Sequence, residues 1–353
     1  MNQFDELILC KNDLKEQLSL LDRTVISYDI NLLPPSLCGG KMGLCVYFFL
    51  LSRLKGDATC QTFAEKLLDD VCACTDAISN IEFPNGLSGI AWSIHYLLEN
   101  GFVSGNINDT LQEVDDFLFR SLHSTYLKEE TKGRNTLLWL LFYYSDRLRT
   151  VEDEVEKMLM QQTVILLVNH IEDNYSYSKW ERPLYFDWVK NSLPLYLLLL
   201  GRIYQYDFFN YKIVKVLDKL SPIVLSSLPV LHADRLYLLY GIRSVLENVQ
   251  LPQWEAHAQL LEANVNHERI LEVEFRNKSV TLRRGVAGYG LLLMMLYGKQ
   301  LPPDVKQKML ERIETSDVWR QYSDLDLSNV GNSLCLLDGY PGISLIYQTL
   351  LKI

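Results

Sequence analysis

Two kinds of hydrophobic pattern alternate along the chain. The first places apolar residues on one helical face and predicts amphipathic helices over residues 4–21, 59–79, 107–123 and 151–172. The second is apolar around most of the helix, as in LCVYFFLL, IAWSIHYLL and GLLLMMLY. A helix of the second kind must be buried on most sides. We therefore expect amphipathic outer helices packed on apolar inner helices.

A glycine-spaced turn precedes the apolar helices. The pattern Gly-x-x-Gly occurs as GKMG at 40–43, GLSG at 86–89, GVAG at 285–288 and GYPG at 339–342. A glycine at a helix entry permits either a positive φ or a close backbone approach that a side chain would block. Degenerate forms of the turn enter three further apolar helices, at Asn135, Ser192 and Ala233. The turn is therefore the mark of an internal repeat.

The spacing of the turns predicts the fold class. They fall at positions 40, 86, 135, 192, 233, 285 and 339, at intervals of 41 to 57 residues. Each interval holds one amphipathic and one apolar helix, which is typical of a helical solenoid or a closed ring. Because the inner helices are apolar on most sides, we expect a single all-α domain over 1–353, a seven-hairpin α/α barrel or toroid. The one predicted exception is a short β-hairpin, in which 271–275 and 279–282 alternate apolar and polar residues about Arg276-Asn277.

Composition limits the partners and the compartment. The formal charge of −10 makes a nucleic-acid backbone an unfavourable partner. No apolar run reaches the roughly 18 residues that a membrane span requires. The N-terminal sequence MNQFDELILC lacks the apolar core of a signal peptide. Seven cysteines without a regular framework suit reduced thiols, so we expect a cytoplasmic protein.

The repeats resemble a known family. Seven α/α hairpins whose inner helices begin with Gly-x-x-Gly, with the specific copies GLSGIAW, GVAGYG and LLDGYPGISL, are similar to lanthionine synthetase C-like (LanC-like) cyclases over essentially the whole chain. The resemblance implies a protein that acts on peptides. Members close thioether rings by adding a peptide cysteine to a dehydrated serine or threonine. Their zinc is held by a cysteine of the fifth repeat and by a Cys-His pair just before the glycine of the sixth.

The residues at those three ligand positions are not zinc ligands in this chain. The family pattern Cys-His-Gly-x-Ala-Gly falls on Arg283-Arg284-Gly285, and the fifth-repeat cysteine falls near Leu231. Zinc needs thiolate, imidazole or carboxylate donors, which guanidinium and leucine side chains cannot supply. We therefore expect no zinc and no other cofactor. Cys38, Cys45 and Cys335 lie near the first and last turns and leave an alternative metal site open.

Charged residues near the turns are the candidate substrate-binding residues. All are expected at one end of the ring, where the turns would line a shared basin; they are Arg283, Arg284, His232, Asp234, Arg235, Asp338 and Asp187. Paired arginines suit carboxylate or phosphate, because each guanidinium can engage two oxygens. Because adjacent cations repel, we expect Arg283 or Arg284 to point into the basin and to pair with a carboxylate, either one of this chain or one of a peptide ligand. The functional interpretation is a polar basin that binds an extended peptide or an anionic group, and the alternative is a set of solvated loop residues.

Two classes of function are compatible with the sequence. The first is a non-catalytic protein with a degenerate zinc site that binds a substrate or precursor peptide and assists a partner maturation enzyme. The second is an enzyme that uses the basin without a metal, with its arginines stabilising an anionic intermediate. An active thioether cyclase and an α/α-barrel carbohydrate-active enzyme are further alternatives; the latter would use Asp187, Asp234 or Asp338 as its carboxylates. The sequence does not decide whether the protein is an enzyme.

Overall fold

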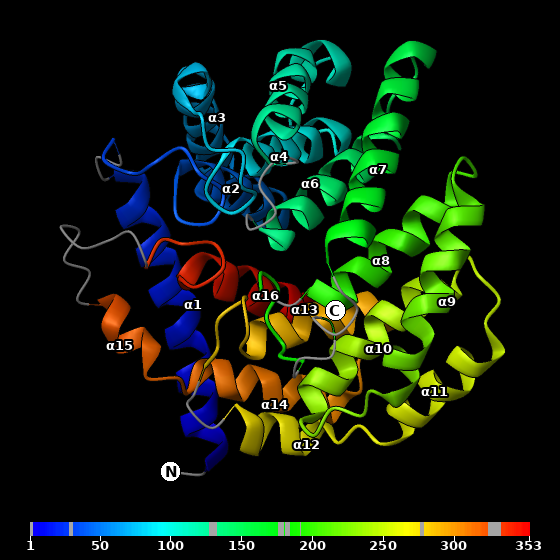
Figure 1. The fold of residues 1–353 in the computed structure, drawn as a ribbon. Helices are drawn as coiled ribbons and strands as arrows, with labels where there is room; N and C mark the ends of the chain where they lie inside the picture. The colour runs from blue at the N-terminus through cyan, green and yellow to red at the C-terminus, as the bar shows by residue number, and fades with distance from the viewer. Residues whose placement is uncertain are drawn as a thin grey trace. The chain divides into compact units, whose positions relative to one another are not determined.

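A computed structural model describes residues 3–27, 31–126, 133–175, 180, 184–190, 192–275, 279–323 and 333–353. The chain divides into two compact units (Figure 1). The first combines the two ends of the chain, Met1–Ile78 and Leu271–Ile353, and the second is Ser79–Ile270. The expectation of one domain over 1–353 stays a prediction.

Helices make up both units, and the described residues form no strand. The first unit contains α1 (Gln3–Ser27), α2 (Lys41–Lys55), α3 (Ala58–Cys72), α13 (Val286–Tyr297), α14 (Pro303–Glu314), α15 (Val318–Ser323) and α16 (Tyr340–Lys352). The second contains α4 (Leu87–Glu99), α5 (Ile107–Ser121), α6 (Arg134–Arg147), α7 (Glu154–Asn174), α8 (Ser192–Gln205), α9 (Asn210–Ser226), α10 (His232–Leu246), α11 (Pro252–Ala263) and α12 (His267–Arg269). Among the described helices, none is long and apolar enough to cross a membrane.

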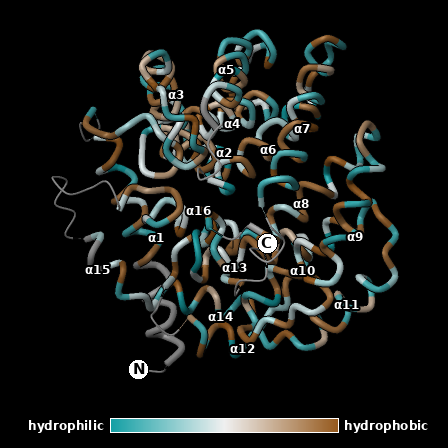
Figure 2. Tube along the Cα trace, viewed as in Figure 1, coloured by the Kyte–Doolittle hydropathy of each residue, from teal (hydrophilic) through white to brown (hydrophobic). Residues whose placement is uncertain are grey.

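The predicted alternation of inner and outer helices is confirmed within each unit. Inner helices begin within one residue of the seven predicted turn positions; they are α2, α4, α6, α8, α10, α13 and α16. In the second unit, α4, α6, α8 and α10 pack side by side in chain order, while α5, α7, α9 and α11 cover them in turn. In the first unit, α16 packs between α2 and α13, and α3 and α14 lie on the outside. Figure 2 shows both hydrophilic and hydrophobic positions along outer helices such as α5 and α7.

The four glycine turns share one backbone structure. In each, the N–H of the first helical residue donates to the carbonyl oxygen seven residues earlier, at 2.8, 2.7, 3.1 and 3.0 Å from Lys41, Leu87, Val286 and Tyr340. The first glycine is extended, with φ of −141° at Gly40 and −103° at Gly339. A Cβ at Gly40 would instead fall on the carbonyl oxygen of Pro34. These glycines are therefore required by close backbone approach and not by a positive φ.

The expected β-hairpin at 271–282 is wrong. Residues Ile270–Glu274 form a π-helical turn, and 279–285 form turns that lead into α13. Ile270, Leu271 and Phe275 are all buried, a spacing that matches one face of a helical turn better than the alternating faces of a strand. Arg276 and Asn277, the expected tip of the hairpin, lie outside the described residues.

A buried carboxylate holds α1 against two inner helices of the first unit. Asp22 on α1 accepts a hydrogen bond from the Tyr47 hydroxyl of α2 at 2.7 Å, and it pairs with Lys55 at 3.1 Å. The Tyr47 hydroxyl in turn lies 2.9 Å from the Ser344 hydroxyl of α16. Burial raises the pKa of Asp22, although Lys55 and the tyrosine hydroxyls act in the opposite direction. This network joins the first and last inner helices.

Candidate functional site

Three turns of the first unit are joined by backbone hydrogen bonds. The N–H of Arg283, in the turn before α13, donates to the carbonyl oxygen of Leu337 at 2.9 Å. The N–H of Leu336, in the turn before α16, donates to the carbonyl oxygen of Cys38 at 2.9 Å. The turns that begin α13, α16 and α2 therefore form one continuous group, which we call the turn belt.

Side chains of the turn belt pair as well. Arg283 Nη1 lies 3.4 Å from Asp338 Oδ2, with the two side chains 20% and 41% exposed. The neighbouring Arg284 is exposed. The expected pairing with a carboxylate is therefore met by Arg283 within this unit, while its place in a shared basin stays a prediction.

Two thiols lie beside this ion pair. Cys335 is buried and Cys38 is half-buried. Burial, together with Cys335 and Asp338, raises the pKa of Cys38 to about 12, although the guanidinium of Arg283 acts in the opposite direction. Burial likewise raises the pKa of Cys335. Both thiols are therefore protonated near neutral pH, and a protonated thiol is neither a good nucleophile nor a good metal ligand.

The second unit contains a hollow at the start of α10. It has a volume of about 540 Å³ and lies between the 184–185 segment, the end of α9 and the loop that leads into α10. Its exposed apolar side chains are Tyr185 (64%), Leu228 (59%), Val230 (85%) and Leu231 (44%). Large apolar side chains that gather at the surface commonly mark a binding site. We call this feature the α10 hollow.

Buried carboxylates hold the loop beside the α10 hollow. Asp234, which is 6% exposed and lines the hollow, accepts a hydrogen bond from the backbone N–H of Phe186 at 2.6 Å. Asp187 is 5% exposed and accepts from the backbone N–H groups of Val189 and Lys190 at 2.8 and 3.0 Å. Both carboxylates therefore fix backbone around the hollow.

His232 and Arg235 hold the loops on the other side of the hollow. Arg235 donates to the carbonyl oxygen of Pro229, at 2.9 Å from Nη2, and also to the carbonyl oxygen of Asn264. His232 Nδ1 lies 3.3 Å from the backbone nitrogen of Asn266, which donates to it. These two side chains therefore hold the loop that leads into α10 against the loop that follows α11.

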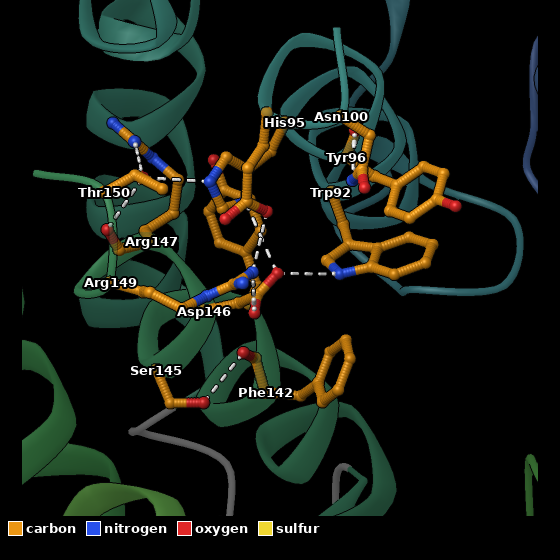
Figure 3. Close-up of polar contacts among 12 residues, drawn as sticks. Trp92, His95, Tyr96, Asn100, Phe142, Ser145, Asp146, Arg147, Arg149 and Thr150 are labelled. Atoms are coloured by element: carbon orange, nitrogen blue, oxygen red, sulfur yellow. Dashed lines mark hydrogen bonds and ion pairs between the residues drawn. The ribbon is translucent and has the colours of Figure 1, made fainter. Parts of the chain in front are cut away.

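A second polar group lies at the far ends of α4, α6 and α8 (Figure 3). Asp146 accepts hydrogen bonds from Trp92 Nε1 at 3.1 Å, Arg149 at 3.0 Å and Arg202 at 3.3 Å. His95 Nδ1 lies 3.4 Å from Asp146 Oδ2. Burial alone would raise the pKa of Asp146, but His95, Arg202 and Arg149 outweigh it and lower that pKa overall.

The order of groups in this cluster resembles a hydrolase triad. His95 Nε2 lies 2.9 Å from Thr150 Oγ1, so the imidazole stands between a hydroxyl and a carboxylate. The ring of His95, however, is completely buried, so that no substrate can reach it. The cluster is therefore structural and ties together the ends of three inner helices.

Comparisons with known proteins show a family likeness over part of the chain and a shared fold over nearly all of it. Residues 31–186 match the family model described as "Lanthionine synthetase C-like protein". The solved structure named nisin cyclase aligns with 97% of this chain and 94% of its own, at 16% sequence identity and a TM-score of 0.56. The chain is therefore similar to the LanC-like family over residues 31–186, and it shares its fold with nisin cyclase. The predicted all-α fold class, an α/α barrel, is confirmed by the likeness to nisin cyclase. No curated protein matches the chain.

The positions that the resemblance assigns to the zinc ligands of LanC-like cyclases do not hold metal ligands in this chain. The resemblance places the Cys-His pair at Arg283 and Arg284, and the fifth-repeat cysteine near Leu231, the residue just before α10. The guanidinium of Arg283 is already beside Asp338. Within the described ranges, no group of three His, Cys, Asp or Glu side chains is placed to hold a metal ion. The alternative trio of Cys38, Cys45 and Cys335 is not such a group either.

The structure brings the predicted site residues together in two sets. Arg283 and Asp338 meet in the turn belt. Asp234 lines the α10 hollow, Arg235 binds the carbonyl oxygen of its lining residue Pro229, and His232 and Asp187 lie in the adjoining segments. That all seven share one basin stays a prediction. The apolar rim was absent from the predicted site, although Leu228, Val230 and Leu231 stand between two helices, where exposed apolar residues are a recognisable signal of binding.

Proposed function

We propose that this LanC-like protein binds a peptide segment in the α10 hollow and does not use zinc. The observation that carries the proposal is the exposed apolar rim of a hollow of about 540 Å³ beside Leu231, where the family carries a zinc-binding cysteine. Exposed Leu228, Val230 and Tyr185 favour an apolar partner surface. An extended peptide supplies such side chains along a backbone that neighbouring polar groups can bind.

The polar surroundings favour binding over catalysis. Arg283, the residue expected to stabilise an anionic intermediate, is paired with Asp338. Asp187 and Asp234 are buried and accept hydrogen bonds from backbone N–H groups, so both carboxylates already hold loop backbone in place. The carbohydrate-active alternative therefore has little support. We propose that the protein presents or retains a precursor peptide for a partner maturation enzyme.

The experiment uses peptides that tile the precursor peptides encoded next to the gene of this protein. We expect a subset to bind the purified protein, as measured by fluorescence anisotropy. Val230→Asp with Leu228→Asp should weaken that binding at least about tenfold, because two charges would enter an apolar contact. Leu260→Asp is the matched control, since Leu260 is also an exposed leucine, 49% exposed, on α11 away from the hollow.

Two results would contradict the proposal. One is binding that is equal in the wild type and in the rim variant. The other is stoichiometric zinc in elemental analysis together with thioether formation in a peptide that carries dehydroalanine and cysteine. The second result would show an active cyclase instead.

A further inference from the structure

The outer helices α5 and α7 are joined to the inner layer in different ways. α5 packs on α4, and α7 packs on α6 (Figure 1). Long side chains of α6 span the space to α5. The hydroxyl of Tyr143 donates to Asp115 Oδ1 at 2.5 Å, and Arg147 donates to Asp115 Oδ2 from Nε at 3.1 Å and from Nη2 at 2.9 Å. Arg147 also donates to Asn108 on α5 at 3.2 Å.

A hollow of about 230 Å³ lies over this bridge. Its floor includes Arg147, which is 1% exposed, and Tyr144, which is buried. Its walls come from α5 and α7 and include Phe119, Leu159 and Met160. We call this feature the α5–α7 groove. A floor made of a fully paired Arg–Asp bridge is rigid, which suits a surface that must keep its shape before a partner arrives.

Apolar side chains continue out of the α5–α7 groove into solvent. Phe119 is 38% exposed and Leu159 is 50% exposed. On the same helix as Leu159, Val155 and Met158 are 62% and 51% exposed. Val155, Met158 and Leu159 are spaced i, i+3 and i+4, so they share one face of α7. An outer helix normally turns such a face toward the protein, and here that face is in solvent.

The lining of the α5–α7 groove carries a net negative charge. The lining contains three carboxylates, Asp115, Asp116 and Glu156, and one guanidinium, Arg147, which leaves a formal charge of −2. Asp115 is already neutralised by Arg147. The two remaining carboxylates, on exposed Asp116 and half-buried Glu156, stand at the edge of an apolar surface. Such an edge attracts a cationic side chain and repels an acidic one.

We propose that the α5–α7 groove docks a segment of a partner protein that places a large apolar side chain against Phe119 and Leu159 and an adjacent lysine or arginine against Asp116 and Glu156. The apolar contact supplies affinity, and the charge pair selects the sequence. The groove is built from α5, α6 and α7, whereas the α10 hollow is built from the 184–185 segment, α9 and α10. The proposals for the two sites can therefore be tested independently of each other.

The test is a selection of random 15-residue peptides by mRNA display against the full-length protein. We expect enriched peptides to share a large apolar residue next to lysine or arginine. Leu159→Ser should weaken the affinity of the protein for the tightest-binding synthetic peptide about tenfold. Asp116→Lys with Glu156→Lys should remove binding of that peptide and allow binding of its counterpart with glutamate in place of the basic residues.

Two controls keep the result specific to the groove. The double variant Glu65→Lys, Asp76→Lys makes the same change of charge at two exposed carboxylates of the other unit and should leave binding unchanged. The rim variant of the α10 hollow should also leave it unchanged. Circular dichroism of each variant must match that of the wild type.

Three outcomes would overturn the proposal. They are a selection without an apolar-basic consensus, enriched peptides whose binding survives the groove variants, and a concentration-dependent dimer that Leu159→Ser dissociates in sedimentation. The last outcome would assign the groove to a second copy of this chain.

Discussion

The guanidinium of Arg283 lies 3.4 Å from the carboxylate of Asp338, at the turn whose sequence resembles the Cys-His-Gly-x-Ala-Gly turn of LanC-like cyclases. The pair joins the turn before α13 to the turn before α16, in parallel with the backbone hydrogen bond from Arg283 to Leu337. A cation and an anion of this chain thus link the two turns through their side chains as well as through their backbone.

The first prediction concerns the energetic weight of this pair. Because the two side chains are 20% and 41% exposed, solvent screens their attraction, and Arg283→Ala should lower the free energy of unfolding by no more than about 1 kcal/mol. Urea unfolding at 50 mM and 500 mM salt measures this value. The loss should shrink at high salt, because screening weakens the pair in the wild type. A loss above about 3 kcal/mol that ignores salt would show that the residue acts through packing instead.

The second prediction compares two adjacent glycines. A Cβ at Gly40 would fall on the backbone of Pro34 and Ser36, whereas a Cβ at Gly39 would meet nothing within 4 Å. Gly40→Ala should therefore lower the free energy of unfolding by about 2–4 kcal/mol, and Gly39→Ala should change it by less than about 1 kcal/mol. Chemical denaturation of both variants gives the comparison. Equal stabilities would remove close approach as the reason for the glycine.

The third prediction concerns acid stability. Because the pKa of Asp146 is lowered in the folded protein, its ionised form adds stability above the ordinary value of 3.8, and this stability is lost as the pH falls through the lower folded pKa. Asp146→Asn should cost about 2–4 kcal/mol at pH 7, since Arg149 and Arg202 would lose a shared buried partner.

Unfolding curves between pH 2 and pH 7 measure this dependence. The stability difference between Asp146→Asn and the wild type should narrow toward pH 2. Asp116→Asn, a change at an exposed aspartate of α5, is the control and should lie near the wild type throughout. A stability difference for Asp146→Asn that stays constant with pH would contradict the role of the carboxylate charge.

The fourth prediction concerns thiol reactivity. With the pKa of Cys38 raised to about 12 and that of Cys335 also raised, few of these thiols are ionised at pH 8. Iodoacetamide should therefore modify exposed Cys74 at least about tenfold faster than either of them. Peptide mass mapping over time gives the rates. Rapid labelling of Cys38 would show that the turn belt opens or that its thiol is activated.

Much of the fold could be predicted because its signal is periodic. The inner helices are apolar on most sides, and the Gly-x-x-Gly turns fixed their starting positions to within one residue. The β-hairpin prediction failed because residues 271–275 are too few for the spacing of apolar residues to distinguish a strand from a helical turn. In the structure, the neighbouring residues Ile270 and Leu271 are both buried, which fits a helical turn better than a strand with one buried face.

The candidate site was harder to predict because the partner of a side chain and the direction in which it points depend on the tertiary structure. Arg283 and Asp338 are far apart in the sequence, and only the joined turns bring them together. Asp187 and Asp234 resembled candidate catalytic carboxylates by position, yet their oxygens accept hydrogen bonds from nearby backbone N–H groups. The α5–α7 groove left no motif at all, because it depends on how two outer helices are spaced above α6.

The shared backbone of the four glycine turns has an evolutionary consequence. The glycine of each turn is buried, but the two residues before it are never fully buried; these pairs are Cys38-Gly39, Pro84-Asn85, Arg283-Arg284 and Leu337-Asp338. Their backbone is fixed by hydrogen bonds that do not depend on side-chain identity. Each turn can therefore accept substitutions at these two positions while its backbone keeps the same structure. In evolution, a few point substitutions at these positions can replace metal ligands by an ion pair, while the surrounding helices keep their structure.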